Sequence, residues 1–167
     1  MPTRDPSLLE RMIDRLTVQR DALAWARAEV DGMAGLVLEV GLGKGRTYDH
    51  LRRLFPPRDI LAFDLGVRVP ADLMPDPDRL FVGDFQETLP RTAERFGRCA
   101  RLVHADFGST DRNHDRGQAE WLAPLLGVLV LPGGIILSDR PLDGPGWRPL
   151  TLPNTAPWPY FAWRVGG

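Results

Sequence analysis

Three alternating glycines, Gly41, Gly43 and Gly45, have the spacing in this chain that most clearly predicts chemistry. They follow the apolar run 36–40 and precede a helical pattern, so they predict a strand, a tight turn and a helix. The backbone amides of such a turn, at the start of a helix, can bind an anionic group of a nucleotide-like ligand. The next apolar run, 60–63, ends at Asp64, whose carboxylate could bind a ribose diol.

The spacing of the glycines narrows the choice of ligand. A dinucleotide fingerprint reads G-x-G-x-x-G, but Arg46 stands here where the third glycine is expected. The phosphate-binding pattern G-x-x-x-x-G-K-[ST] is not present either. Glu39, two residues before the first glycine, adds a negative charge near the turn. This charge suits a ligand with a positive group better than a pyrophosphate.

An acidic residue followed by G-x-G-x-G resembles motif I of the class I S-adenosylmethionine (SAM)-dependent methyltransferases, whose ligand carries a sulfonium and an ammonium group. Residues 36–140 agree with this resemblance in the order and spacing of the strand ends. Asp64 falls where such enzymes hold the ribose hydroxyls, and Asp84 falls where an acid often meets the adenine amino group. Asp106 ends a fourth predicted strand near the expected methyl-transfer region. Residues 131–139 match the Pro-Gly-Gly turn that precedes the family's fifth strand.

The resemblance also implies how the cofactor is bound. The amides of 43–46 would bind the methionine carboxylate, and Glu39 would face the ammonium, directly or through water. Phe85 or Leu65 would pack on the adenine ring. For each carboxylate, a solvated strand end or a helix cap is the alternative. The predicted cofactor-binding residues are Glu39, Gly41, Gly43, Lys44, Gly45, Arg46, Thr47, Asp64, Leu65, Asp84, Phe85, Asp106 and Phe107.

His104 and Asp106 are the candidate catalytic residues. Methyl transfer requires alignment of acceptor, methyl group and sulfur, and in some cases removal of a proton. The two side chains share one face of a predicted strand, and His104 could act as a general base. A buried neutral histidine bonded to the backbone is the alternative. The loop 109–116 is expected to cover the acceptor side, with His114 at a helix start; His50 is expected to be structural or near the ligand loop.

A metal site is not expected. Asp106 and Asp139 end adjacent predicted strands, as the magnesium-binding acids of small catechol-type O-methyltransferases do. Those enzymes continue with an asparagine, whereas this chain has Arg140, whose guanidinium would repel a divalent cation. Asp139 and Arg140 are expected to form an ion pair or to contact an anionic acceptor.

The length of 167 residues and the order of the patterns predict a single domain, 1–167, of the α/β class. We expect a Rossmann-like, doubly wound, mostly parallel sheet of six or seven strands, with helices at 7–30, 47–55, 86–96 and 113–131. Pro124 should interrupt or bend the last helix, and 66–78 should replace a regular crossover helix. The parts are an N-terminal helical segment (1–33), the core (36–140) and a tail rich in proline and tryptophan (141–167), whose last strand covers 160–165. A complete final hairpin hardly fits after the fifth strand.

Composition excludes several function classes. The net charge of −1 gives no electrostatic case for binding nucleic acid or an anionic membrane. The single cysteine, Cys99, and a start without an apolar signal core favour a cytoplasmic protein. The longest apolar region, 121–137, is broken by Pro124 and by 132–134, so it does not predict a membrane span.

The sequence therefore predicts a SAM-dependent methyltransferase that acts on a small-molecule acceptor and releases S-adenosylhomocysteine (SAH). O- or C-methylation is favoured, because no Asn-Pro-Pro-Tyr-like motif follows Val103. A SAM- or SAH-binding module without turnover is the main alternative. A nicotinamide-dependent oxidoreductase would share the fold, but Arg46 in place of the third glycine and the negative charge of Glu39 do not fit a dinucleotide. Trp147, Trp158 and Trp163 could supply part of the pocket or the surface of a homo-oligomer.

Overall fold

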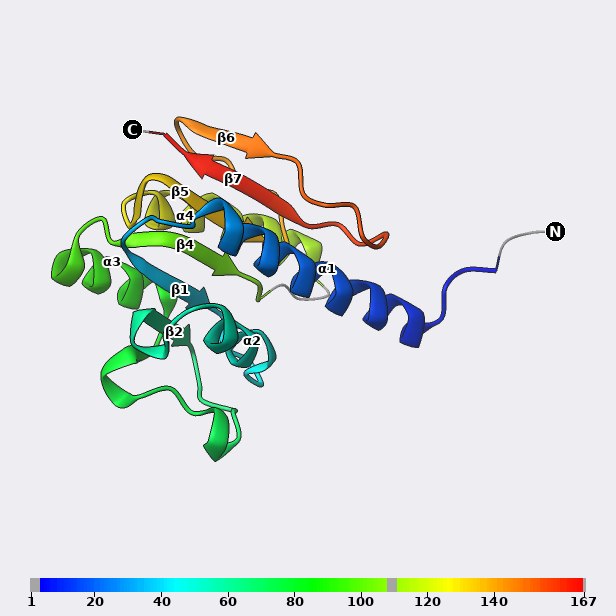
Figure 1. The fold of residues 1–167 in the computed structure, drawn as a ribbon, viewed down its shortest axis with the longest axis horizontal. Helices are drawn as coiled ribbons and strands as arrows, with labels where there is room; N and C mark the ends of the chain where they lie inside the picture. Colours follow the sequence, from blue (N-terminus) through cyan, green and yellow to red (C-terminus); the bar gives the residue numbers. More distant parts are fainter. Residues whose placement is uncertain (1–3, 108–110, 167) are drawn as a thin grey trace.

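A seven-stranded sheet forms the centre of the protein, in the order β3-β2-β1-β4-β5-β7-β6 (Figure 1). The computed structural model describes residues 4–107 and 111–166. The strands are β1 (Leu36–Val40), β2 (Ile60–Asp64), β3 (Leu80–Val82), β4 (Ala100–Ala105), β5 (Val130–Ser138), β6 (Trp147–Leu150) and β7 (Phe161–Val165). Strands β1 to β5 are parallel, and β7 runs antiparallel to both β5 and β6. The predicted α/β, Rossmann-like, mostly parallel sheet is confirmed.

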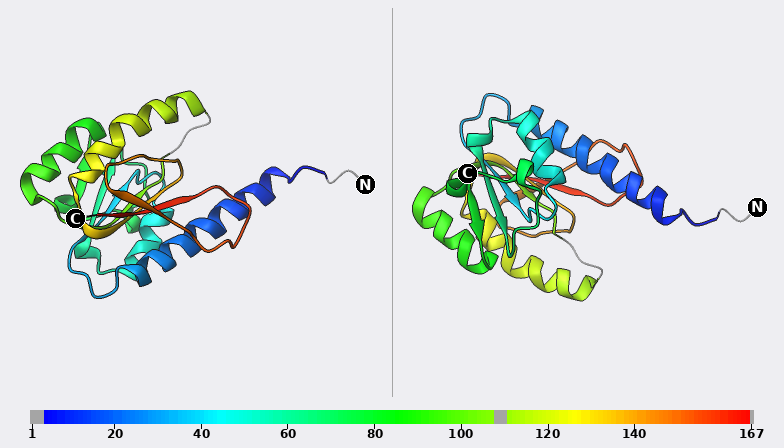
Figure 2. Two further views of the ribbon diagram at one scale, coloured as in Figure 1. Left: turned by 90° about the horizontal axis from the view of Figure 1, so that it is seen from above. Right: turned by 90° about the horizontal axis from the view of Figure 1, so that it is seen from below.

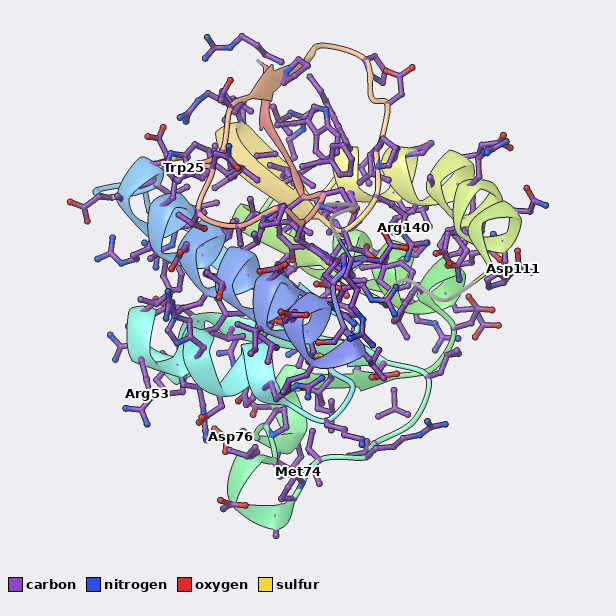
Figure 3. The ribbon with its side chains drawn as sticks, turned by 90° about the vertical axis from the view of Figure 1, so that its right-hand side faces the viewer. Trp25, Arg53, Met74, Asp76, Asp111 and Arg140 are labelled. Carbon is purple, nitrogen blue, oxygen red and sulfur yellow. The ribbon has the colours of Figure 1, made fainter. Side chains whose placement is uncertain are left out.

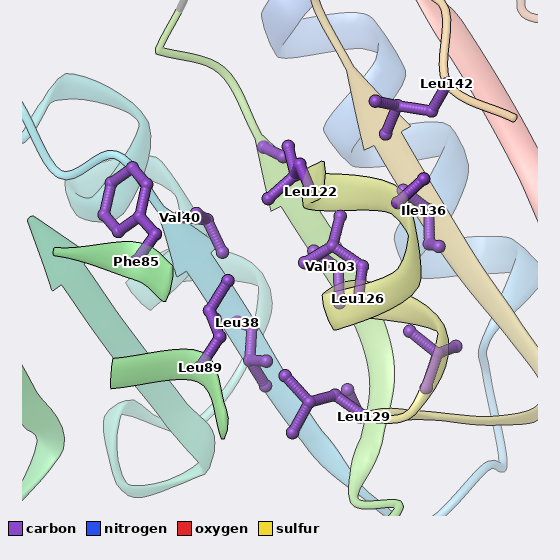
Figure 4. Packing of buried hydrophobic residues seen from close by; sticks show 14 of the residues in the cluster. Leu38, Val40, Phe85, Leu89, Val103, Leu122, Leu126, Leu129, Ile136 and Leu142 are labelled. Carbon is purple, nitrogen blue, oxygen red and sulfur yellow. The ribbon is translucent and has the colours of Figure 1, made fainter. Parts of the chain in front are cut away.

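Helices cover both faces of this sheet (Figure 2). They are α1 (Leu8–Glu29), α2 (Arg46–Leu54), α3 (Phe85–Phe96) and α4 (Arg112–Gly127). Because side chains alternate along a strand, Val37 packs with α1 and α2, whereas Leu38 packs with α3 and α4. Figure 4 shows the apolar cluster on the face that α3 and α4 cover, in which Leu89 of α3 and Leu126 of α4 pack on the sheet. Glu39, two residues after Val37, therefore lies on the face covered by α1 and α2.

The first helix begins with a capping box. Ser7 Oγ accepts a hydrogen bond from the Glu10 amide at 3.2 Å, and the Glu10 carboxylate accepts one from the Ser7 amide at 2.6 Å. The helix runs opposite to the parallel strands, and its amino-terminal half extends past their carboxyl ends (Figure 1). In that half Leu8, Leu9 and Ile13 are 73%, 69% and 53% exposed. An apolar helix face thus overhangs the edge of the sheet where ligands bind in such folds.

The fourth helix and the fifth strand differ from the expected boundaries. Helix α4 continues through Pro124 and ends at Gly127, rather than reaching residue 131. Strand β5 starts at Val130 and includes residues 132–134, where its pairing with β4 shifts register. The Pro-Gly-Gly sequence is therefore an irregularity within the strand, not a turn before it. Between β2 and β3 the crossover is shortened, as expected, to the 3-10 turns Ala71–Leu73 and Pro77–Arg79.

The expectation that a final hairpin hardly fits was wrong. Strands β6 and β7 pair in antiparallel fashion, and β7 joins the sheet beside β5. The pair fits because β6 has four residues and β7 has five. Pro149 lies in β6, which is an edge strand, the position where proline is found within sheets. The Trp147 and Trp163 rings pack with centroids 6.2 Å apart, so these tryptophans contribute to the core of the tail.

None of the helices in the described parts of the chain combines the length and the apolar character needed to cross a membrane.

Candidate active site

The glycine turn joins β1 to α2 at the carboxyl edge of the sheet. Gly41 and Gly43 have φ of +96° and +54°, a region that favours glycine. A Cβ on Gly41 would lie 2.7 Å from Phe107 Cβ, so the turn packs directly against the residue after Asp106. A Cβ on Gly43, by contrast, would meet no described atom within 4 Å. The turn is thus held tightly on the β4 side and leaves open space in front of the α2 amino terminus.

Asp64 braces this turn from the end of β2. Its Oδ2 accepts a hydrogen bond from the Gly43 amide at 2.6 Å, and its Oδ1 accepts one from the Leu65 amide at 2.7 Å. A carboxylate in this position both fixes the loop and retains lone pairs for a second donor. Lys44 and Arg46 are exposed beside it, and Leu65 is 69% exposed.

Asp84 and Phe85 begin α3. Asp84 Oδ1 accepts a hydrogen bond from the Gln86 amide at 2.8 Å, so this carboxylate is the helix cap that the sequence left open as an alternative. Phe85 is buried, and its ring meets that of Phe107 edge to face at 4.9 Å. The two aromatic rings line the carboxyl edge of the sheet between β3 and β4.

Glu39 is completely buried at the end of β1. Its Oε1 accepts a hydrogen bond from Thr47 Oγ1 at 3.1 Å and lies 2.9 Å from His104 Nδ1. Its Oε2 has no hydrogen-bond partner among the described residues. A buried carboxylate oxygen without a donor is costly, so this atom indicates a place for a ligand donor such as an ammonium group.

His104 lies beside Glu39 because the two residues are partners in the β1–β4 register. Its imidazole is fully buried, and Nε2 lies 2.5 Å from the Tyr160 hydroxyl. The expected alternative of a backbone partner is thus not what the structure shows, since both ring nitrogens meet side chains. Because the His104 side chain is not exposed, it cannot contact an acceptor directly and could act on one only through its neighbours.

Asp106, just after β4, is enclosed by three side chains from distant segments. Its Oδ2 accepts hydrogen bonds from the Tyr160 hydroxyl at 3.0 Å and from Gln19 Nε2. Its Oδ1 lies 3.3 Å from Arg15 Nη2. Glu39, His104, Tyr160 and Asp106 therefore form one continuous hydrogen-bonded chain, which we call the Glu39–Asp106 chain. It connects the glycine turn to the methyl-transfer edge predicted from the sequence.

The surroundings shift two pKa values within this chain. Burial lowers the pKa of His104, but the charge of Glu39, the hydrogen bond that His104 donates to it, and the charges of Asp106 and Asp139 outweigh this effect and raise the pKa overall. Burial and the neighbouring charge of Asp106 raise the pKa of Tyr160 well above its usual range. Tyr160 is therefore a neutral phenol, and His104 holds a proton more readily than a free histidine.

Arg140 lies just after β5, at the same carboxyl edge of the sheet as Asp106 (Figure 3). Its Nε lies 3.3 Å from Asp139 Oδ1, which is the ion pair expected from the sequence. Its Nη1 donates to Gln118 Oε1 of α4 at 2.8 Å, and its guanidinium lies 4.4 Å from the centre of the Phe107 ring. No group of three or more possible metal ligands gathers in residues 4–107 and 111–166.

The predicted acceptor loop, 109–116, lies partly outside the described residues, because 108–110 are not described. Asp111 caps α4 by accepting hydrogen bonds from the amides of Asn113 and His114, so His114 stands in the first turn as expected. His50 lies on α2 and lines a hollow of about 160 Å³ between α1 and α2, next to Thr47 and Gln19.

Sequence reasoning missed three residues of the site: Arg15, Gln19 and Tyr160. One signal for Gln19 was available, because a polar residue interrupts the otherwise apolar face of α1 between Leu16 and Leu23. Tyr160 was assigned to the last strand and not to a site. Its contact partners, His104 and Asp106, are 56 and 54 residues away in the sequence. No local spacing reveals such a contact.

The fold and the site define a class of protein: a Rossmann-like domain that binds a nucleotide-derived ligand with a positively charged group at the carboxyl edge of its sheet. Residues 6–165 match the family model for S-adenosyl-L-methionine methyltransferase. A crystal structure of an S-adenosyl-L-methionine methyl transferase from Silicibacter pomeroyi DSS-3 is 39% identical, with a TM-score of 0.90 over 97% of this chain and 100% of that one. The chain belongs to the S-adenosyl-L-methionine methyltransferase family.

More distant structures share the fold alone. Cofactor-bound Rv0187 from MTB is 18% identical, with a TM-score of 0.59 over 99% of this chain and 91% of that one. CalS11, a TDP-rhamnose 3'-O-methyltransferase of calicheamicin biosynthesis, is 22% identical, with a TM-score of 0.56 over 93% and 80% of the two chains. None of the curated proteins compared with the chain matches it.

Proposed function

We propose that this SAM-dependent methyltransferase methylates an oxygen or carbon atom of a small-molecule acceptor. The observation that supports this best is Asp106, a carboxylate at the methyl-transfer edge that two segments outside the Rossmann-like core hold in place. A carboxylate there can accept the proton of a hydroxyl or of an acidic C–H group. One structural neighbour, CalS11, is a TDP-rhamnose 3'-O-methyltransferase. The absence of an Asn-Pro-Pro-Tyr-like motif after Val103 argues against methylation of nucleobase or amide nitrogens in the usual way.

The residues present fit the cofactor. When bound, SAM supplies a methyl group already activated by its sulfonium, so the protein has to bind and orient it. Glu39 Oε2, buried and unpartnered in the described chain, would accept a hydrogen bond from the ammonium. The amides of 43–46 at the start of α2 would hold the carboxylate, and the open space before Gly43 leaves room for it.

The nucleoside part would lie along the ends of β2 and β3. Asp64 would accept the ribose hydroxyls with the lone pairs that its two amide contacts leave free. Asp84 would use its second oxygen for the adenine amino group while Oδ1 caps α3. Leu65, exposed beside Asp64, would cover one face of the adenine, with the Phe85 and Phe107 rings beneath it.

The overhanging half of α1 would supply an apolar wall for the acceptor. Leu9 and Met12 precede Leu23 and Ala26 by two heptads, so they continue the helix face that packs on the domain. Leu9 is 69% exposed, and Met12 is 37% exposed. An acceptor with an apolar or aromatic part would bury these side chains, whereas a wholly polar one would not.

A pair of glycine variants tests cofactor binding. Gly43→Val places a branched side chain in the open space before α2, and we expect it to abolish SAH binding in calorimetry. Gly32→Val is the matched control, because Gly32 also has positive φ (+75°) and open space but lies between α1 and β1, before the first strand begins. Wild-type protein should bind SAM and SAH and not NAD. SAH binding by Gly43→Val as tight as by Gly32→Val would contradict the assignment of the loop.

Acceptor screening with isotopically labelled SAM tests the reaction. We expect mass spectrometry to detect label on hydroxylated or carbon-acid small molecules, and Asp106→Asn to reduce transfer by a factor of 10² or more. Labelling of amines alone would contradict the proposed acceptor class. Gel filtration with light scattering and localisation of a tagged chain would test the two remaining expectations, a homo-oligomer and a cytoplasmic location.

A second candidate, a SAM- or SAH-binding module without turnover, is favoured by one observation. The Asp106 side chain is only 3% exposed, and three side chains contact it. If no acceptor can reach it, the domain would bind the cofactor without using it. Tight SAH binding together with no transfer to any acceptor class would favour this candidate.

A further inference from the structure

We propose that the Glu39–Asp106 chain is a proton relay: Asp106 takes the proton of the acceptor, and His104 stores it while paired with Glu39. The relay rests on the proposed function, because it needs an acceptor that loses a proton. It assigns a role to Tyr160, which comes from the tail and passes the proton between the two residues. His104 thereby acts through Tyr160 and Asp106 rather than by touching the acceptor.

A count of hydrogen atoms supports the relay. The chain contains three contacts, Glu39–His104, His104–Tyr160 and Tyr160–Asp106, and each hydrogen bond requires one hydrogen atom. A neutral imidazole and a phenol supply only two. All three contacts can therefore be hydrogen bonds only when the chain has bound one additional proton. The three contact distances therefore fit the protonated chain, which has one hydrogen more than neutral His104 and Tyr160 supply.

Neighbouring donors place the additional proton on His104. Thr47 donates to Glu39, while Gln19 and Arg15 donate to Asp106, so donors already occupy oxygens of both carboxylates. The charged and titratable groups that face His104 are Glu39 of β1, Asp106 after β4, Asp139 after β5 and Tyr160 before β7. Arg15 of α1 acts on it through Asp106. The carboxylates outweigh the cation, so an imidazolium is favoured.

Tyr160 transmits the proton and does not keep a charge. Its pKa is raised well above the usual range by burial and by Asp106, so it is not deprotonated on its own. It can nevertheless donate its hydrogen to His104 Nε2, at 2.5 Å, while it receives one from Asp106, at 3.0 Å. Such a paired exchange leaves the phenol neutral before and after the transfer.

Asp106 keeps one oxygen for the relay and can release the other to an acceptor. Oδ2 accepts hydrogen bonds from Tyr160 and from Gln19 of α1. Oδ1 is contacted by Arg15 at 3.3 Å, and the Arg15 side chain is 35% exposed on the overhanging half of α1. An acceptor hydroxyl can therefore replace the Arg15 guanidinium at Oδ1 without disturbing the relay at Oδ2.

The step balances as follows. The acceptor O–H bond breaks, and its electron pair forms the new bond from oxygen to the methyl carbon, while the S–C electron pair stays on the sulfur. The proton moves to Asp106, Asp106 passes one to Tyr160, and Tyr160 gives its own to His104 Nε2. The net result is a methyl ether, a neutral thioether, an ionised Asp106 and an imidazolium paired with Glu39. The positive charge that the sulfonium would lose is balanced by the one gained at His104.

Cofactor binding prepares the relay by competing for Glu39. An ammonium at Oε2 reduces the negative charge that holds the proton on His104, because both cations share one carboxylate. The bound state should therefore have a neutral His104 with its hydrogen on Nδ1, ready to accept at Nε2. The free protein should have an imidazolium at the same pH.

Nitrogen-15 NMR of the imidazole rings tests this directly, because the chain has three histidines. In the free protein His104 should titrate above a free histidine, and saturating SAH should lower its midpoint by about one pH unit or more. The signal of exposed His114 should not respond to SAH and serves as an internal reference. SAH binding measured by calorimetry, with no change at His104, would overturn the relay and leave the proposed function intact.

Two tyrosine variants separate the relay from a structural role. Tyr160→Phe should lower the His104 midpoint in the free protein and reduce kcat with SAH affinity changed less than threefold, whereas Tyr48→Phe should change none of these. An unchanged His104 midpoint in Tyr160→Phe would refute the relay even if no acceptor were known. Failure of the wild-type protein to bind SAH would refute the proposed function instead. The titration of His104 in the free protein would still test whether the hydrogen-bonded chain forms.

Discussion

The Tyr160 hydroxyl should contribute more to stability than the Tyr48 hydroxyl, and Tyr160→Phe removes it with almost no change of shape. The chain has two tyrosines, which gives a matched control. Tyr48 is also buried, at 3% exposure, but belongs to α2 and has no part in the Glu39–Asp106 chain. Both substitutions keep the ring and delete one oxygen, so their difference isolates the hydrogen bonds of Tyr160.

The magnitude follows from the groups that lose a partner. Hydrogen bonds to charged groups contribute about 1.5–3 kcal/mol, and Asp106 loses one of its donors. His104 Nε2 is left buried without a partner, which costs about 1–3 kcal/mol. Asp106 keeps Gln19 and Arg15, so the two effects do not add fully. We expect Tyr160→Phe to lower the free energy of unfolding by about 2–4 kcal/mol, and Tyr48→Phe by about 0.5 kcal/mol or less.

Urea unfolding of the free protein, followed by tryptophan fluorescence, measures both values. The effect should be larger at pH 6 than at pH 9, because an unpaired N–H of a buried imidazolium costs more than an unpaired lone pair of the neutral ring. Equal losses for the two variants at both pH values would refute the reasoning. Such a result would mean that the contacts of Tyr160 contribute no net stability in solution.

Three further predictions concern the same edge of the sheet. Gly41→Ala should destabilise the fold by about 2 kcal/mol more than Gly43→Ala. Both glycines have positive φ, but only a Cβ on Gly41 would collide with Phe107. Equal urea midpoints for the two variants would contradict this prediction. Glu39→Gln should weaken SAH binding by about 10- to 100-fold in calorimetry, the loss of one charge-assisted hydrogen bond, and unchanged affinity would exclude the ammonium contact. The pKa of His104 is raised by folding, so its stabilising contribution is complete below about pH 6.5 and is lost as the pH rises through the pKa in the folded protein. His104→Gln should therefore flatten this part of a plot of Tm against pH. A plot parallel to that of the wild-type protein would contradict the raised pKa.

Most of the sheet could be predicted because its strands are short apolar runs that end at recognisable residues. The runs at 36–40 and 60–63 became β1 and β2, and the positions of Glu39 and Asp64 at their ends followed directly. Strand β6 could not be found in this way. It contains Pro149 between Arg148 and Leu150, and it exists because β7 offers an unpaired edge, which no local pattern reports.

The roles of single carboxylates were less predictable than their positions. Asp64 and Asp84 both stand at the expected strand ends, yet their first partners are backbone amides of Gly43 and Gln86. A loop amide or a helix end supplies donors wherever the chain turns, and sequence spacing does not show which donor lies nearest. The ligand roles of both residues therefore remain predictions for binding experiments.

In the proposed relay, two segments outside the Rossmann-like core contribute to the chemistry. The core alone provides Glu39, His104 and Asp106 on neighbouring strands, but it leaves Asp106 at an open strand end. Helix α1 adds Gln19 and Arg15, and the tail adds Tyr160, so the carboxylate becomes enclosed and linked to the histidine. A domain with the same five parallel strands but without these three side chains would keep the residues that we propose bind the cofactor. It would lack the connection from Asp106 to His104, so a proton accepted by Asp106 would have to pass from there to solvent.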